Sequence, residues 1–105
     1  MRKILLLITT LVSTVYLSNA QIITNIGNVF APDTLTVTVG ETITFNIGAS
    51  HNAVEVNEAT YIANGTASNG GFNIPYSGGT WTVDSAKTYY YVCQPHAGLG
   101  MKGVI

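Results

Sequence analysis

The residues of this chain that could bind a metal ion are few and occur in an ordered pattern. Cys93, His96 and Met101 fall within nine residues, and His51 lies about forty residues earlier. The pattern reads His…Cys-x2-His-x4-Met. A single cysteine or methionine is more often a small apolar residue or a filler of the core than a ligand. Because every histidine and cysteine of the chain belongs to this one pattern, we expect a shared site.

The types of donor atom indicate copper. The four side chains offer one thiolate, two imidazoles and one thioether, and zinc sites in proteins use cysteine, histidine and carboxylate ligands instead of a thioether. A trigonal plane of two histidines and one cysteine with a weak axial methionine is the arrangement of blue-copper electron-transfer sites. It suits both Cu(I) and Cu(II), so little rearrangement accompanies a one-electron change. The sequence therefore predicts one type 1 copper ion.

Alternating apolar and polar residues predict the elements that must position these ligands. The alternation favours half-buried β-strands joined by tight turns, and therefore an antiparallel sandwich or barrel. A turn at Gly40-Glu41 separates two of the strands. The chain between residues 57 and 79 is rich in turn signals, with one helical turn at 58–63. The predicted strands are residues 22–26, 34–39, 42–47, 53–56, 80–83, 87–92 and 102 onward.

The strand at 87–92 is expected to deliver the thiolate to the interior. If the strand stays regular to its end, Tyr89, Tyr91 and Cys93 share one face, because side chains two residues apart point to the same side of a sheet. The following loop then brings His96 and Met101 around the same point.

Three segments of the chain resemble the cupredoxin family of type 1 blue-copper proteins. Residues 30–45 look like the paired N-terminal strands of that family, and residues 51–56 look most like the first ligand strand of phytocyanins. The loop from Cys93 to Met101 has the spacing of plastocyanins and pseudoazurins. Phytocyanins carry a disulfide, which a chain with one cysteine cannot form. The resemblance implies an all-β Greek-key sandwich or barrel of roughly seven strands.

The resemblance also implies a role for each residue near the copper ion. His51, Cys93 and His96 would form the equatorial plane, with Met101 as the axial ligand. Asn52 would tie the two ligand-bearing segments together, and Pro95 lacks an N–H group that could donate to the cysteine sulfur. Both are expected to act on the metal from outside its ligand set. The expected docking patch around His96 consists of Ala97, Gly98 and Leu99.

The first twenty residues have the pattern of a secretory signal peptide. Arg2 and Lys3 precede an apolar run over residues 4–17, and small residues follow at 18–20. We expect cleavage before Gln21, export to the periplasm or medium, and no stable membrane insertion. Residues 21–105 would then form a single domain with two lysines, five acidic residues and a net charge of −3. The family's last strand runs further past the methionine, so here it is expected to be short or the sequence to be part of a longer one.

These features favour a soluble, monomeric electron carrier with transient redox partners that dock near His96. With charged residues at only 9% of the chain, nothing resembles the basic patch of a nucleic-acid-binding protein. Both histidines are used by the predicted site, which leaves none for a catalytic copper, so we expect no enzymatic activity. Val92 stands where photosynthetic plastocyanins have a tyrosine, and a photosystem partner is not expected. Two alternatives are an exported copper store or chaperone, and the electron-entry domain of a larger copper enzyme.

Overall fold

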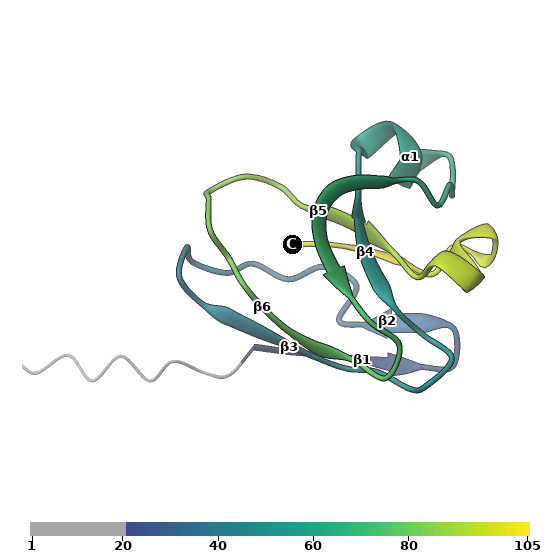
Figure 1. The fold of residues 1–105 in the computed structure, drawn as a ribbon, viewed down its shortest axis with the longest axis horizontal. Coiled ribbons are helices and arrows are strands. Elements are labelled where there is room, and N and C mark those ends of the chain that lie inside the picture. Colours follow the sequence, from purple (N-terminus) through teal and green to yellow (C-terminus); the bar gives the residue numbers. More distant parts are fainter. Residues whose placement is uncertain (1–20) are drawn as a thin grey trace, which may run out of the picture.

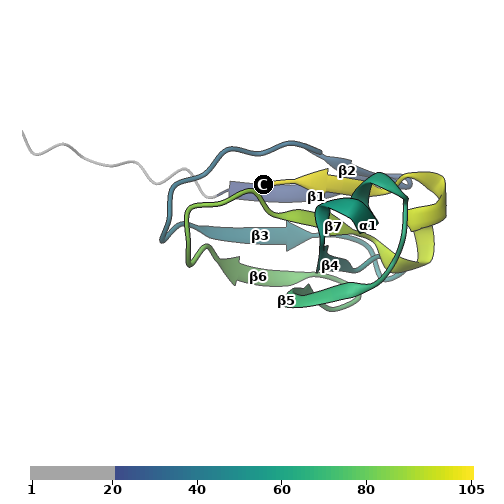
Figure 2. The same ribbon diagram turned by 90° about the horizontal axis from the view of Figure 1, so that it is seen from above.

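Two four-stranded β-sheets face each other in this protein (Figures 1 and 2). The computed structural model describes residues 21–105, and the predicted signal peptide at 1–20 lies outside them. The prediction of an all-β sandwich is confirmed. One pair, β1 with β3, is parallel, and the other paired strands are antiparallel. In spatial order, the first sheet contains β2 (Val29–Ala31), β1 (Gln21–Ile26), β3 (Thr42–Asn46) and β6 (Gly79–Thr82), and the second contains β5 (Ser68–Ile74), β4 (Ala53–Val56), β7 (Tyr90–Val92) and β8 (Lys102–Val104).

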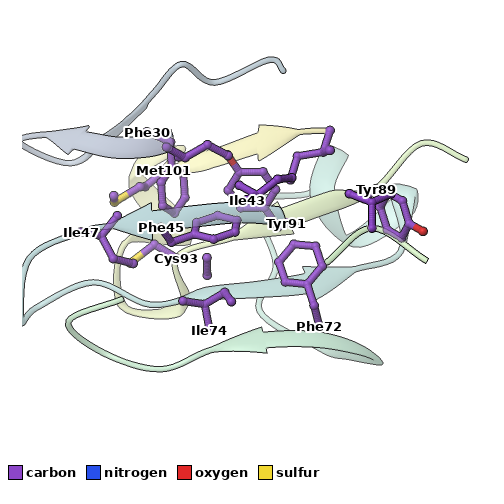
Figure 3. Close-up of a cluster of buried hydrophobic side chains, with 14 residues drawn as sticks. Phe30, Ile43, Phe45, Ile47, Phe72, Ile74, Tyr89, Tyr91, Cys93 and Met101 are labelled. Carbon is purple, nitrogen blue, oxygen red and sulfur yellow. The ribbon is translucent and has the colours of Figure 1, made fainter. Parts of the chain in front are cut away.

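Aromatic side chains fill the space between the sheets. The ring of Tyr91 lies edge-on to Phe30 and Phe45, with ring centroids 4.8 and 5.6 Å away. Tyr89, Tyr91 and Cys93 are all buried in this core, as predicted, but β7 begins at Tyr90, so the predicted strand at 87–92 was too long at its start. Cys93 and Met101 lie toward one end of the core and Tyr89 at the opposite end (Figure 3). The core is thus continuous with the cluster of predicted ligands.

Two short helices cover the second sheet and one of its ends. The predicted helical turn at 58–63 is confirmed as α1 (Glu58–Ile62), and the ring of its Tyr61 packs on Tyr90 at 5.1 Å. The 3₁₀ helix η1 (Gln94–Leu99) follows β7 directly. Among the described residues, no helix is long and apolar enough to cross a membrane.

The predicted strand at 34–39 was wrong. Only Thr34 forms a β-bridge, to Val104, and the residues after it form no strand. A groove of about 570 Å³ is lined by residues of 34–39 together with residues of 85–89. Leu35 and Val37 still pack against the core, but Val39 is 48% exposed. Alternation therefore predicted burial correctly at two positions, although main-chain pairing with β8 ends at Leu35 and no strand continues beyond it.

Strand β5 lies in a stretch that we expected to be irregular. Its first residues are polar or glycine, so the alternation that marks a strand is absent there. Its backbone pairs with β4, and the buried carboxylate of Glu55 on β4 accepts a hydrogen bond from the Asn69 side chain at 2.6 Å. A Cβ atom at Gly71 would overlap that carboxylate. The glycine weakens the strand signal because it makes room for a tertiary contact.

The hydroxyl group of Tyr91 is buried without a hydrogen-bond partner among the described residues. An unsatisfied buried hydroxyl costs about 1–3 kcal/mol. The Tyr91→Phe variant is therefore expected to be more stable by about 1 kcal/mol, as measured by urea unfolding of the metal-free protein near neutral pH. Equal or lower stability would show that the hydroxyl is satisfied in solution.

The same variant has an expected signature at alkaline pH. Burial, reinforced by Asp33 and Tyr61, raises the pKa of Tyr91 above its usual value. The unfolded chain can lose this proton near pH 10 but the folded chain cannot, so stability contributed by Tyr91 falls as the pH rises above about 10. The Tyr91→Phe variant should lose stability less steeply in that range.

Candidate metal centre

Three donor atoms from two distant parts of the chain converge at one end of the core. The Nδ1 atoms of His51 and His96 are 3.2 Å apart, and the sulfur of Cys93 lies 3.7 and 3.4 Å from them. Bonds of nitrogen and sulfur ligands to a first-row metal ion are about 2.0–2.3 Å long. Ligand atoms that share one such ion have separations of this size, so the three side chains fit a metal ion between them.

The turn after β7 places Cys93 and His96 on the same side. Cys93 precedes η1, and its carbonyl oxygen accepts a hydrogen bond from the His96 amide at 3.1 Å. In a 3₁₀ helix, side chains three positions apart are aligned, which is the spacing of these two ligands. Gly100 ends the helix in the left-handed region at a φ of 81°. The Cys93–x2–His96 spacing thus becomes a preformed pair of ligands.

Met101 follows this turn, and its main chain lies beside Cys93 and His96. Its carbonyl oxygen accepts a hydrogen bond from the Cys93 amide at 2.9 Å, and its own amide donates to the His96 carbonyl at 3.2 Å. The side chain is fully buried at the end of the core that also holds Cys93 (Figure 3). Together with the two imidazoles and the thiol, this thioether completes the soft donor set that copper prefers.

His51 comes from a loop on the other side of the site. Its amide donates to the Gly48 carbonyl at 3.1 Å, and the Gly48 amide donates to Oδ1 of Asn25 at 2.9 Å. The loop is therefore fastened to β1. Burial, and secondarily the charge of His96, lowers the pKa of His51. A lower pKa favours the neutral imidazole, which is the form that binds a metal.

The structure places Asn52 between the two ligand-bearing segments. Its side-chain Oδ1 accepts a hydrogen bond from the Gln94 amide at 2.8 Å, and its Nδ2 donates to Oε1 of Gln94 at 3.0 Å. Gln94 was missed by our sequence analysis, although its position directly after Cys93 was a signal that could have found it. Pro95 lies in the first turn of η1 with its ring exposed.

One residue of the predicted docking patch cannot belong to it. Ala97 is 0% exposed and packs with Val56 and Val92 on the outer side of the second sheet, so its assignment to a docking surface was wrong. The periodicity of η1 turns it inward while Gly98 and Leu99 remain exposed, Leu99 at 71%. His96 is half-buried, which makes it the most accessible of the three clustered donors.

Ile26 and Val29 form an exposed apolar pair that the sequence analysis did not find. Ile26 and Val29 pair across the turn between β1 and β2, and Ile26 is 73% exposed. In both ribbon views this turn lies at the same end of the sandwich as η1 (Figures 1 and 2). The sequence analysis placed Ile26 at the end of a predicted strand and assigned no element to Val29, and only the fold shows that both lie at the end of the sandwich that holds η1.

Comparison with known proteins points to one family. Residues 19–105 match the family model described as copper binding proteins, plastocyanin/azurin family. The chain is 40% identical over 82 residues to a plastocyanin of Scenedesmus fuscus, covering 73% of this chain and 84% of that protein. It is 38% identical over 84 residues to plastocyanin A/B of Petroselinum crispum, covering 75% and 87%. The solved pseudoazurin of Methylobacterium extorquens AM1 shares the fold, with a TM-score of 0.61 at 19% identity and coverage of 82% and 72%.

Proposed function

Because this chain belongs to the plastocyanin/azurin family of copper-binding proteins, we propose that it carries single electrons between redox partners. The resemblance to cupredoxins is thereby confirmed. Copper is the cofactor of this family, and His51, Cys93, His96 and Met101 are arranged as in a type 1 copper site. The plastocyanins that match are electron carriers and not enzymes. The observation that carries the proposal is the convergence of three donor atoms within 3.2–3.7 Å of one another.

The bound copper ion would supply a one-electron couple between Cu(I) and Cu(II). The chain contributes a site that resists rearrangement. His51, Cys93 and Met101 are buried, so water is excluded from their side of the cluster. Main-chain hydrogen bonds join Cys93 to Met101 and Met101 to His96, which restrains the loop that carries these three ligands. Rigid ligands of this kind favour fast electron transfer, because little reorganisation accompanies the change of charge.

Burial of the donors favours a carrier over a copper store or chaperone. A protein that hands copper to others needs ligands that an acceptor can reach. Here His51 and Cys93 are buried, and His96 is the one clustered donor that is only half-buried. A copper-loaded sample that loses its metal rapidly to a mild chelator would favour the storage function instead.

A visible spectrum with one equivalent of Cu(II) tests the proposed function. We expect an intense blue band that bleaches when ascorbate is added and returns on reoxidation. Repeated cycling without loss of copper would support an electron carrier. A colourless protein, or a band that cannot be cycled, would overturn the proposal.

The proposed docking face lies at the end of the sandwich that holds η1 and the half-buried His96. It consists of Gly98 and Leu99 on η1 together with Ile26 and Val29 on the β1–β2 turn. A small apolar face suits weak and transient redox encounters, which bury little surface. We propose that the protein is a monomer between encounters.

The Leu99→Glu variant is expected to slow electron self-exchange between two copies by roughly tenfold. The added carboxylates would face each other in the encounter, and like charges at an interface lower the association rate. Line broadening of NMR signals in mixtures of the Cu(I) and Cu(II) forms measures this rate. The matched control is Val39→Glu, which adds the same charge at an exposed apolar position outside this face. Equal slowing in both variants would argue against the docking face.

We also propose that the protein is exported and that residues 21–105 form its single domain. The support is the pattern of two basic residues, an apolar run and small residues before Gln21. Mass spectrometry of the protein recovered from the periplasm or medium should find Gln21 at the N-terminus. An intact Met1 would contradict cleavage at this site.

A further inference from the structure

The side chain of Gln94 connects three segments that are far apart in the sequence. Its Oε1 accepts a hydrogen bond from Nδ2 of Asn52 at 3.0 Å, and its Nε2 donates to the main-chain carbonyl of Thr66 at 3.1 Å. Its main-chain amide donates to Oδ1 of Asn52 at 2.8 Å. The three segments are the loop of His51, the turn of Cys93 and His96, and the connection from α1 to β5.

These hydrogen bonds can run in only one direction. The Thr66 carbonyl is an acceptor only, so it must face the NH₂ group of Gln94. The Gln94 oxygen then faces Asn52, which must present its own NH₂ group. The oxygen of Asn52 is thereby turned toward the Gln94 amide. The Thr66 carbonyl thus fixes which way the side-chain amide of Gln94 faces, and Gln94 fixes which way the side-chain amide of Asn52 faces. The main-chain amide of Gln94, directly after Cys93, then finds the acceptor oxygen of Asn52 in place.

The hydrogen bonds of Asn52 matter for stability because this side chain is buried. Asn52 is buried, and a buried amide group left without partners costs about 1–3 kcal/mol. In the described structure both side-chain hydrogen bonds of Asn52 go to Gln94. Asn52 directly follows His51, and Gln94 directly follows Cys93. Loss of the Gln94 side chain would therefore loosen the contact that holds two ligands at a fixed separation.

We propose that Gln94 is a positioning residue that sets the His51 loop against the Cys93–His96 turn, using the Thr66 carbonyl as its fixed anchor. The inference rests on the proposed function, because its purpose is to hold the ligands of a copper ion. The sequence analysis predicted that Asn52 connects the two ligand-bearing segments. The proposal adds a third segment, at Thr66, and assigns the connection to Gln94, which binds no metal.

Two variants of Gln94 and one control test the proposal. Gln94→Met keeps the size of the side chain but removes all its hydrogen bonds. Gln94→Glu still accepts from Asn52 but, as a carboxylate, cannot donate to Thr66. Thr66→Ala keeps the main-chain carbonyl and is the control. The first readout is hydrogen exchange of the main-chain amide at position 94 in metal-free protein, and the second is the EPR hyperfine splitting and reduction potential of the Cu(II)-loaded protein.

The expected order of exchange at position 94 is slowest in the native protein and Thr66→Ala, faster in Gln94→Glu and about tenfold faster in Gln94→Met. Gln94→Met is also expected to shift the EPR splitting and the potential. If the exchange rate at position 94 and the spectra of Gln94→Met equal those of the native protein, the positioning role is overturned. Native exchange in Gln94→Glu would overturn the anchoring at Thr66. If Gln94→Met does not fold, Gln94→Glu decides alone.

Failure of this inference is distinguishable from failure of the proposed function. Hydrogen exchange in the metal-free protein reports the contact whether or not copper is the natural ligand. A native protein that gives no blue band would overturn the electron-carrier function while the exchange result still stands.

Discussion

The Cys93→Ser variant is expected to lose the intense blue band completely when it is loaded with Cu(II). That band requires a bond between the copper ion and a thiolate, and Cys93 is the one cysteine of the chain. A serine hydroxyl is a harder and more weakly binding donor that leaves the imidazoles of His51 and His96 in place. Absorption and EPR spectra of the loaded variant measure the effect. We expect a pale protein with the EPR spectrum of an ordinary Cu(II) site.

Tyr91→Phe is the control for the Cys93→Ser experiment. It alters a buried side chain two residues before Cys93 and offers no donor to the metal, so the blue band should remain. Circular dichroism should show that both variants keep the native strand content. A Cys93→Ser protein that stays blue would show that the band does not come from the Cys93 thiolate and would contradict the assignment of a type 1 centre.

The Ile43→Ala variant is expected to lose about 2–5 kcal/mol of stability. Ile43 lies on β3 with no exposed surface, inside the core that also holds Cys93 and Met101. Removing its methyl groups leaves a cavity that rigid neighbours cannot fill. A domain of this size has a total stability of roughly 4–13 kcal/mol, so much of the protein could unfold. Urea unfolding of the metal-free protein measures the loss.

Ile26→Ala is the matched control, because it removes the same atoms from a residue that is 73% exposed. Its stability should change by less than about 0.5 kcal/mol. Both isoleucines lie on strands of the same sheet, and only burial separates them. Equal losses in the two variants would contradict the packing described for this core.

Local patterns in the sequence were enough to predict most of the strands. The alternation at β3 depends on which side of the strand faces the core, and that information lies within a few residues. The same reasoning failed at residues 34–39, where Leu35 and Val37 alternate as in a strand but main-chain pairing with β8 ends at Leu35. It also failed at β5, where Gly71 is explained by the carboxylate of Glu55 on another strand. Partners and close approaches across the sheet leave no periodic signal.

The sequence by itself determined the chemistry of this protein, because the types of donor and the short spacing from Cys93 to Met101 are local properties. The first turn of the 3₁₀ helix η1, which follows Cys93 directly, brings Cys93 and His96 together within four residues of sequence. Only the tertiary structure decided that His51 lies 3.2 Å from His96, that Ala97 is buried and that Gln94 reaches Thr66. Each of these depends on how segments forty or thirty residues apart pack against one another, which no spacing along the chain encodes.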